Sequence, residues 1–132
     1  MKKKISHNEK IFIAGSTGMA GSAIYRSLAK KGYGKKELGG SFLTPSRKEL
    51  DLLDKKSVDI WFKTNNPTVT ILAAAKVGGI FANKSNPTEF LLENINIQTN
   101  ILKTRNMPNS ISLVCGQCNF NIHGIIEKII NE

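Results

Sequence analysis

Cysteine and histidine are scarce in this chain of 132 residues, which contains two of each. Cys115 and Cys118 are too few for the disulfide framework of a small extracellular domain, so we expect a reducing compartment. A zinc site at the two thiols would need two more ligands, and the spacing of His7 and His123 fits no familiar zinc pattern. We therefore expect no metal site.

Long apolar runs are also missing. No run approaches the roughly 20 residues that a membrane-spanning helix needs, and residues 1–10 lack the apolar centre of a secretory signal. These absences favour a cytoplasmic protein with no membrane partner.

The length of the chain fits one domain of ordinary composition. A complete enzyme with a cofactor domain and a substrate domain normally needs considerably more chain.

Acidic residues are nearly absent from the first 36 positions, which carry nine basic residues and one acid, Glu9. The remaining positions carry ten basic and nine acidic residues, and the formal net charge is +9. A basic leader of this kind could touch nucleic acid. However, no aromatic stacking positions are interleaved with its lysines. We interpret residues 1–9 as a flexible basic leader and expect no nucleic-acid partner.

Short apolar runs alternate with stretches of helical periodicity along the rest of the chain. The expected strands are 10–14, 41–44, 68–74 and 111–114. The expected helices are 20–31, 55–65, 87–105 and 122–130, with a surface loop between 32 and 41. We expect Gly32 to end the first helix, and Asp54 and Asn86 to cap the second and the third. The third of these helices carries one broad apolar face made of Phe90, Leu91, Ile95, Ile97, Ile101 and Leu102.

Alternation of strand and helix predicts the α/β class, with a parallel sheet and right-handed crossovers. We expect a partial, doubly wound Rossmann sheet of about four strands. Its nucleotide-binding portion would span residues 10–104. A divergent tail at 105–132 would follow, with the fold truncated there and the substrate domain absent.

A glycine-rich loop, Gly15-Ser16-Thr17-Gly18-Met19-Ala20-Gly21, lies between the first expected strand and the first expected helix. This is the position of a dinucleotide-binding turn. Gly15 would permit the tight turn, Gly18 would let the backbone approach a pyrophosphate, and Gly21 would let the helix pack closely on the strand. The phosphates would then meet free N–H groups at the positive end of the helix. A glycine turn without a ligand is the alternative.

The segment after the second strand, Thr44-Pro45-Ser46-Arg47-Lys48, contains two cations and no acid. NAD-binding enzymes place an Asp or Glu about 20 residues beyond the glycines, where it holds the ribose 2′-hydroxyl. A guanidinium at this place suits the 2′-phosphate of NADP instead. We therefore expect NADP as the cofactor, held by Arg47 and Lys48, although both could simply be surface residues.

Four segments of the chain together resemble the GDP-L-fucose synthase family, a group of extended short-chain dehydrogenases/reductases that act on a sugar nucleotide. They lie between about Ile11 and Thr104, in the order that this family has. The segments are 12–24, 47–54, 72–80 and 93–102. The most specific of them is the string Ala74-Ala75-Lys76-Val77-Gly78-Gly79-Ile80, because generic members of the superfamily show a different loop there.

The resemblance implies a set of site residues. The loop 15–21 would bind the pyrophosphate, Arg47 the 2′-phosphate, and Asp51 and Leu52 the adenine side. Ala74 and Ala75 would lie along the nicotinamide ribose, and Lys76, Val77, Gly78 and Gly79 would approach the substrate, a nucleotide sugar. In this family NADPH reduces a 4-keto-6-deoxy-mannose nucleotide at C4, after epimerisation at C3 and C5. A Ser, a Tyr and a Lys serve the reduction, and a Cys and a His serve the epimerisations.

The chain departs from this family where the catalytic residues belong. After the fourth strand the family reads Ser-Ser-Cys-Ile-Tyr-Pro, whereas Val114 is followed here by Cys115-Gly116-Gln117-Cys118. The Tyr-x-x-x-Lys pair is absent, because neither Tyr25 nor Tyr33 has a lysine four residues later. Without that pair no proton donor is positioned for hydride transfer. We expect no catalytic residues in this chain, and cofactor binding without turnover.

Several alternatives stay open. The chain is either a truncated or split reductase, or a stand-alone nucleotide-binding or regulatory module that a partner chain completes. Cys115 could take the place of the family's catalytic cysteine, and Cys115 with Cys118 could form a thioredoxin-like redox pair. The bare edge of a short parallel sheet would favour self-association.

Overall fold

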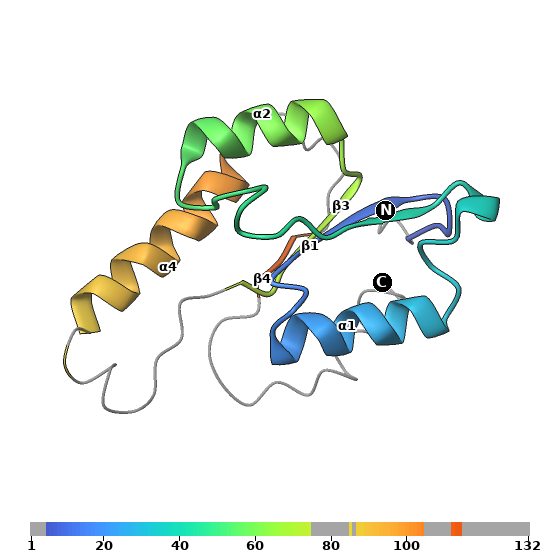
Figure 1. The fold of residues 1–132 in the computed structure, drawn as a ribbon, viewed down its shortest axis with the longest axis horizontal. Coiled ribbons are helices and arrows are strands. Elements are labelled where there is room, and N and C mark those ends of the chain that lie inside the picture. Colours follow the sequence, from blue (N-terminus) through green and yellow to red (C-terminus); the bar gives the residue numbers. More distant parts are fainter. Residues whose placement is uncertain (1–4, 75–84, 86, 105–111, 115–132) are drawn as a thin grey trace.

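A four-stranded parallel sheet forms the centre of the computed structural model, which describes residues 5–74, 85, 87–104 and 112–114 (Figure 1). Its strands are β1 (Lys10–Ala14), β2 (Ser41–Leu43), β3 (Val69–Leu72) and β4 (Ser112–Val114). They lie in the order β2-β1-β3-β4, and each neighbouring pair is parallel. The strand order therefore reverses between β1 and β3, where doubly wound sheets bind ligands. The expected fold class is confirmed, although β3 ends two residues earlier than predicted.

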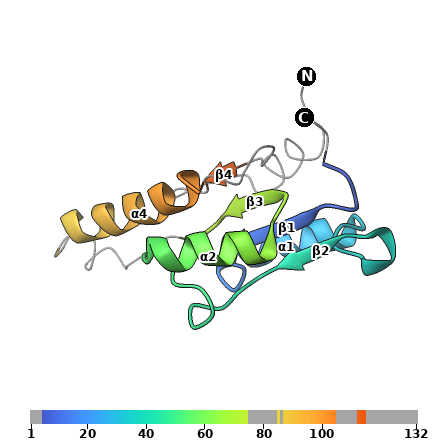
Figure 2. The same ribbon diagram turned by 90° about the horizontal axis from the view of Figure 1, so that it is seen from above.

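Both faces of this sheet are covered by helices. Helix α1 (Met19–Lys30) lies on one face, and α2 (Lys55–Asn65) and α4 (Pro87–Leu102) lie on the other (Figures 1 and 2). Because successive side chains of a strand point to opposite faces, β1 contributes to both layers. Ile11 and Ile13 join the α1 side, and Phe12 and Ala14 join the α2 and α4 side. A strand buried on both faces has a continuous apolar sequence, which made β1 recognisable.

Helix α1 ends at the glycine that the sequence predicts. Gly32 has a φ of 90°, and the N–H of Tyr33 donates to the carbonyl of Leu28 at 3.1 Å. A left-handed glycine just beyond the last turn lets the chain leave a helix while its last carbonyls stay hydrogen-bonded. The expected loop that follows contains one 3₁₀ turn, η1 (Lys36–Leu38), before β2 begins.

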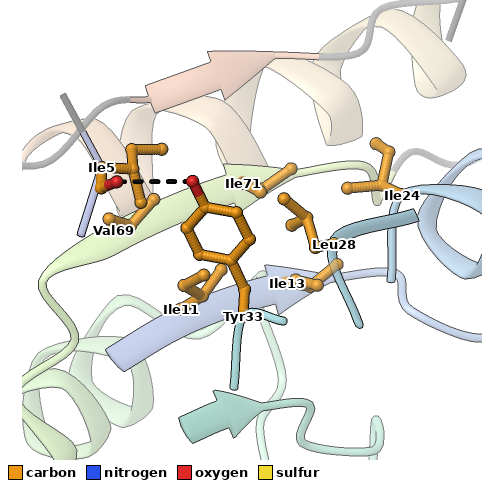
Figure 3. Close-up of a cluster of buried hydrophobic side chains, with 8 residues drawn as sticks. All are labelled: Ile5, Ile11, Ile13, Ile24, Leu28, Tyr33, Val69 and Ile71. Carbon is orange, nitrogen blue, oxygen red and sulfur yellow. Dashed lines mark hydrogen bonds between the residues drawn. The ribbon is translucent and has the colours of Figure 1, made fainter. Parts of the chain in front are cut away.

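Two residues of the expected leader, Ile5 and His7, pack against this end of α1. Ile5 is buried among the side chains of the α1-side cluster, and the Tyr33 hydroxyl donates to the Ile5 carbonyl at 3.4 Å (Figure 3). The ring of His7 stacks on the ring of Tyr33 with a centroid distance of 4.4 Å. This part of the leader is therefore packed on the domain.

Helices α2 and α4 begin and end close to their predicted positions. Asp54 caps α2, as expected, because its carboxylate accepts the N–H of Lys56 at 3.2 Å. The chain leaves α2 through Asn66, which has a φ of 47°. Helix α4 ends at Leu102, three residues before the predicted end. The predicted cap Asn86 and the predicted helix 122–130 lie outside the described residues.

The broad apolar face of α4 is buried only in part. Only Ile97 and Ile101, one turn apart, are buried against the sheet, and Leu91, Ile95 and Leu102 are exposed. The two sets lie on different stripes of the helix. The sheet covers one stripe only, so the other apolar side chains of the helix stay exposed.

Thr70 in β3 offers a test of this packing. Its hydroxyl is fully buried and has no hydrogen-bond partner within the described part of the chain. An unsatisfied buried hydroxyl costs about 1–3 kcal/mol. Thr70→Val keeps the shape and removes the hydroxyl, so we expect the free energy of unfolding to rise by about 1 kcal/mol. Urea denaturation followed by the fluorescence of Trp61, the single tryptophan, measures this change.

Thr68→Val is the matched control. The Thr68 hydroxyl accepts the backbone N–H of Lys10 at 2.8 Å, so valine at this position should lower the free energy of unfolding. If Thr70→Val lowers stability as much as Thr68→Val does, the Thr70 hydroxyl is satisfied in the folded protein and the prediction is wrong.

Candidate functional site

Three loops that bear predicted site residues meet at the carboxyl edge of the sheet. The glycine loop follows β1, residues 44–54 follow β2, and Ala73 and Ala74 follow β3. The N–H of Ala73 donates to the carbonyl of Ala14 at 2.9 Å, which ties the first and third loops together at their roots. The carboxyl ends of parallel strands at the point of order reversal are where nucleotides bind in folds of this class.

The glycine loop turns directly from β1 into α1. Gly15 has a φ of 76°, and its carbonyl accepts the N–H of Gly18 at 3.0 Å. Gly18 then takes the N-cap position of α1, and its carbonyl accepts the N–H of Ser22 at 2.9 Å. The expected tight turn at Gly15 is therefore present, because a positive φ is a conformation that glycine adopts without strain.

Close backbone contacts leave no room for a side chain at Gly15 or at Gly21. A Cβ added to Gly21 would lie 1.9 Å from the Gly15 carbonyl oxygen. A Cβ added to Gly15 would lie 2.8 Å from the carbonyl carbon and oxygen of Ala73. Gly21 thus lets α1 pack directly on the loop, as predicted, and Gly15 lets the loop rest on the end of β3.

Gly18 is less crowded than these two glycines. A Cβ added there would approach only the Gly15 carbonyl oxygen, at 3.3 Å. Ser16 is half-buried, and Thr17 and Met19 are exposed. The two crowded glycines therefore shape the loop, while a side chain at Gly18 would meet a single neighbouring atom.

The amino-terminal end of α1 is chemically suited to an anion. No side chain caps this end, and no acidic residue lies in the first turn. The first N–H groups of a helix have no partner inside the helix, and its dipole places partial positive charge there. This end of the helix fits the phosphates of a dinucleotide.

The turn after β2 carries the two predicted cations. The N–H of Ser46 donates to the carboxylate of Glu49 at 2.6 Å, and the Ser46 carbonyl accepts the N–H of Leu50 at 2.9 Å. Glu49 is thus directed back to the backbone, and neither Arg47 nor Lys48 forms an ion pair with any other described residue. Both cations are exposed on this turn.

The Ser46–Glu49 pair makes the turn sensitive to pH. The hydrogen bond from the Ser46 N–H lowers the pKa of Glu49 below its ordinary value of 4.5. A lowered folded-state pKa means that the ionised carboxylate stabilises the turn above that value, and that this stabilisation is lost as the pH falls through the lower folded-state pKa. We expect the protection factor of the Ser46 amide, which is the ratio of its intrinsic to its observed exchange rate at each pH, to fall across this range, and Glu49→Gln to give a protection factor that does not change with pH. A protection factor that follows pH equally in both proteins would contradict this.

The adenine-side residues lie in a second turn just before α2. The carboxylate of Asp51 accepts the N–H of Leu53 at 3.0 Å, and the Asp51 carbonyl accepts the N–H of Asp54 at 3.2 Å. Leu52 is half-buried and packs on the core cluster of the α2 and α4 side. The side-chain amide of Asn100 in α4 donates to the carbonyls of Leu52 and Leu53 at 2.8 and 3.1 Å.

Two features of the site were missed by sequence reasoning. The Ser46-x-x-Glu49 spacing is that of a capping box, so the turn could have been recognised from the sequence. Asn100 gave only a weak signal, an asparagine inside an otherwise good helix, because its partners lie 47 and 48 positions earlier in the chain.

Part of the predicted site lies outside the residues that the structure describes. Ala74 is half-buried beside the core cluster. Ala75 and the predicted substrate-side residues 76–79 lie outside the described residues, as do Cys115 and Cys118. Within the described ranges, no helix is long and apolar enough to cross a membrane. The same ranges contain no group of three His, Cys, Asp or Glu side chains that could hold a metal ion.

Two proteins of known sequence are similar to most of this chain. The putative GDP-L-fucose synthase 2 of Arabidopsis thaliana is 41% identical over 98 residues, which are 74% of this chain and 28% of that protein. The GDP-L-colitose synthase of Yersinia pseudotuberculosis is 43% identical over 93 residues, or 70% of this chain and 28% of that protein. The chain thus spans little more than a quarter of the length of these curated relatives.

A solved structure shares the fold. It is a GDP-mannoheptose C4 reductase from Campylobacter jejuni with NADP bound. It has a TM-score of 0.70 and 31% identity, and the match covers 82% of this chain and 33% of that one. Residues 11–110, which include β2, β3 and all of β1 except Lys10 but not β4, match the model of one protein family. The chain belongs to the NAD dependent epimerase/dehydratase family.

Proposed function

We propose that this chain is the NADP(H)-binding portion of an epimerase/reductase that acts on a GDP-linked 4-keto-6-deoxy-mannose type of sugar. The observation that supports this most is the carboxyl edge of the sheet, where an uncapped helix end and a turn with two unpaired cations follow neighbouring strands. A pyrophosphate at the helix end and a 2′-phosphate at the turn would suit these two positively charged positions. The relatives named for GDP-linked sugars support the substrate class.

Each predicted residue has a role in this proposal. The backbone from Gly15 to Gly21 holds the pyrophosphate, including Ser16, Thr17, Met19 and Ala20, and Arg47 with Lys48 holds the 2′-phosphate. Asp51 and Leu52 meet the adenine, and Ala74 and Ala75 lie along the nicotinamide ribose. Lys76, Val77, Gly78 and Gly79 form the loop nearest the sugar. NADPH, when bound, supplies a hydride.

The chain of 132 residues is proposed to bind without turnover. Its two tyrosines, Tyr25 and Tyr33, lie on α1 and just after it, and Ala29 and Glu37 stand four residues beyond them instead of lysine. Tyr33 is also buried, with its hydroxyl directed to Ile5. The missing lysines and the burial of Tyr33 support the proposal that neither tyrosine serves as the proton donor.

Completion by a partner chain and self-association through the sheet edge belong to the same proposal. Among the described strands, β2 pairs with β1 alone, so its outer edge has no described partner. An unpaired edge offers backbone groups to another chain. Size-exclusion chromatography with light scattering tests this, and a monomer at all concentrations would count against it.

A fluorescence titration of the purified chain with NADPH and with NADH tests the proposed function. We expect saturable binding of NADPH and weaker binding of NADH, because only NADPH presents a phosphate to the turn after β2. Equal affinity for the two would refute the 2′-phosphate role of that turn. Binding of neither would refute the function as a whole.

A further inference from the structure

We propose that Asn100 is a positioning residue, which holds the turn from Asp51 to Asp54 and thereby sets the affinity for the adenosine end of the cofactor. The inference rests on the proposed function and extends it to a helix, α4, that carries no predicted ligand contact. Asn100 stands 48 positions from Leu52 in the sequence, yet its side chain reaches the turn directly.

The contact uses the full donor capacity of the amide. The Nδ2 atom of Asn100 lies 2.8 Å from the Leu52 carbonyl oxygen and 3.1 Å from the Leu53 carbonyl oxygen. An amide nitrogen has two hydrogens and can serve two acceptors at once. Within the described residues, no backbone N–H donates to either carbonyl. Asn100 therefore satisfies two consecutive carbonyls that have no other described partner.

Helix α4 provides a rigid base for this amide. Ile97 and Ile101, the neighbours of Asn100 along the helix, are buried in the core cluster that also includes Leu50 and the half-buried Leu52. The helix and the turn are thus held together by apolar packing, with the amide placed between them. A side chain on a packed helix orients a loop better than the loop orients itself.

The orientation of the turn matters because two of its polar groups have no described hydrogen-bond partner. Leu53 and Asp54 use their N–H groups inside the turn, on Asp51, whereas the Leu52 N–H has no described acceptor. One Asp51 oxygen accepts the Leu53 N–H, and the other has no described donor. A free N–H next to a free carboxylate oxygen matches the acceptor and donor on the edge of an adenine. Rotation of the peptide groups of Leu52 and Leu53 would disturb this pair.

The test uses two variants and a matched control. Asn100→Ala removes the amide, and Asn100→Asp keeps its size but cannot donate when ionised. Asn96→Ala removes an exposed asparagine of the same helix that has no described hydrogen bond. The probes are NADPH and 2′,5′-ADP, which shares only the adenosine end with its 2′-phosphate. Residue-resolved amide exchange of the unliganded chain is the second measurement.

We expect both Asn100 variants to weaken NADPH and 2′,5′-ADP by the same factor, about tenfold, as the loss of two hydrogen bonds implies. Asn96→Ala should bind like the unsubstituted chain. Exchange should accelerate at Leu53 and Asp54 while β1 and α1 stay protected, which a general loss of stability would not produce.

Three results would overturn the inference. They are unchanged affinity in the Asn100 variants, weaker NADPH binding with unchanged 2′,5′-ADP binding, or accelerated exchange throughout β1 and α1. A chain that binds neither probe before any substitution refutes the proposed function, and the inference falls with it. Binding by the unsubstituted chain and by Asn100→Ala alike refutes the inference alone.

Discussion

Replacing Gly15 by alanine is expected to lower the free energy of unfolding by about 2–5 kcal/mol, from two costs that add. The φ of 76° is a left-handed conformation, which costs a non-glycine residue roughly 1–2 kcal/mol. The new Cβ would also lie 2.8 Å from the backbone of Ala73, and crowding of a packed site costs about 1–3 kcal/mol. Relief is difficult, because the Gly15 carbonyl is tied to Gly18 and β1 is tied to Ala73.

Gly39→Ala separates the two costs. Gly39 has a φ of 78°, nearly that of Gly15, but a Cβ there would meet only the Asn8 side chain, at 3.6 Å. We expect this variant to lose only the conformational part, roughly 1–2 kcal/mol. Urea denaturation of both variants gives the comparison. Equal losses would mean that the glycine loop can move away from β3, and that the crowding at Gly15 is unimportant.

Replacing Arg47 by alanine is expected to weaken NADPH binding by about tenfold or more while leaving NADH binding unchanged, since a hydrogen bond to a charged group contributes about 1.5–3 kcal/mol. Arg47 lies exposed on the turn whose acid, Glu49, is occupied by the Ser46 N–H. The guanidinium is therefore available to the 2′-phosphate, which NADH lacks. Rising salt should reduce the NADPH preference of the unsubstituted chain, because exposed charges are screened.

Arg26→Ala is the matched control for this experiment. Arg26 is exposed on α1, about two turns from the end of the helix that faces the site, and its loss removes the same charge from the chain. Fluorescence titration should show unchanged NADPH binding by this variant. A similar weakening in both variants would indicate that net charge, and not a contact at the turn after β2, attracts NADPH.

Most of the architecture follows from local sequence patterns. The apolar run from Lys10 to Ala14 and the glycines after it predicted β1 and the turn into α1, because buried strands and glycine turns have strong local signatures. The cap at Asp54 and the glycine at position 32 likewise predicted where α2 begins and α1 ends. These features depend on a few neighbouring residues, so reading them needs no knowledge of the rest of the fold.

The sequence did not show which side chains are buried where burial depends on distant parts of the chain. The apolar residues of α4 form one broad face in the sequence, and only Ile97 and Ile101 of that face are buried in the structure. Ile5, within the segment that we interpreted as a leader, is buried in one cluster with Tyr33, which the local sequence did not indicate. Hydropathy measures the tendency of a side chain to be buried, and only the arrangement of the elements decides whether a partner surface exists.

The sequence by itself determined the fold class, the glycine loop and the presence of two cations after β2, because each is encoded by contiguous residues. Tertiary structure decided how these parts act together. It directs Glu49 to the Ser46 N–H and leaves Arg47 unpaired, and it brings Asn100 to the carbonyls of Leu52 and Leu53. Hydrogen bonds between elements depend on distance and direction in space, which residue order alone does not specify.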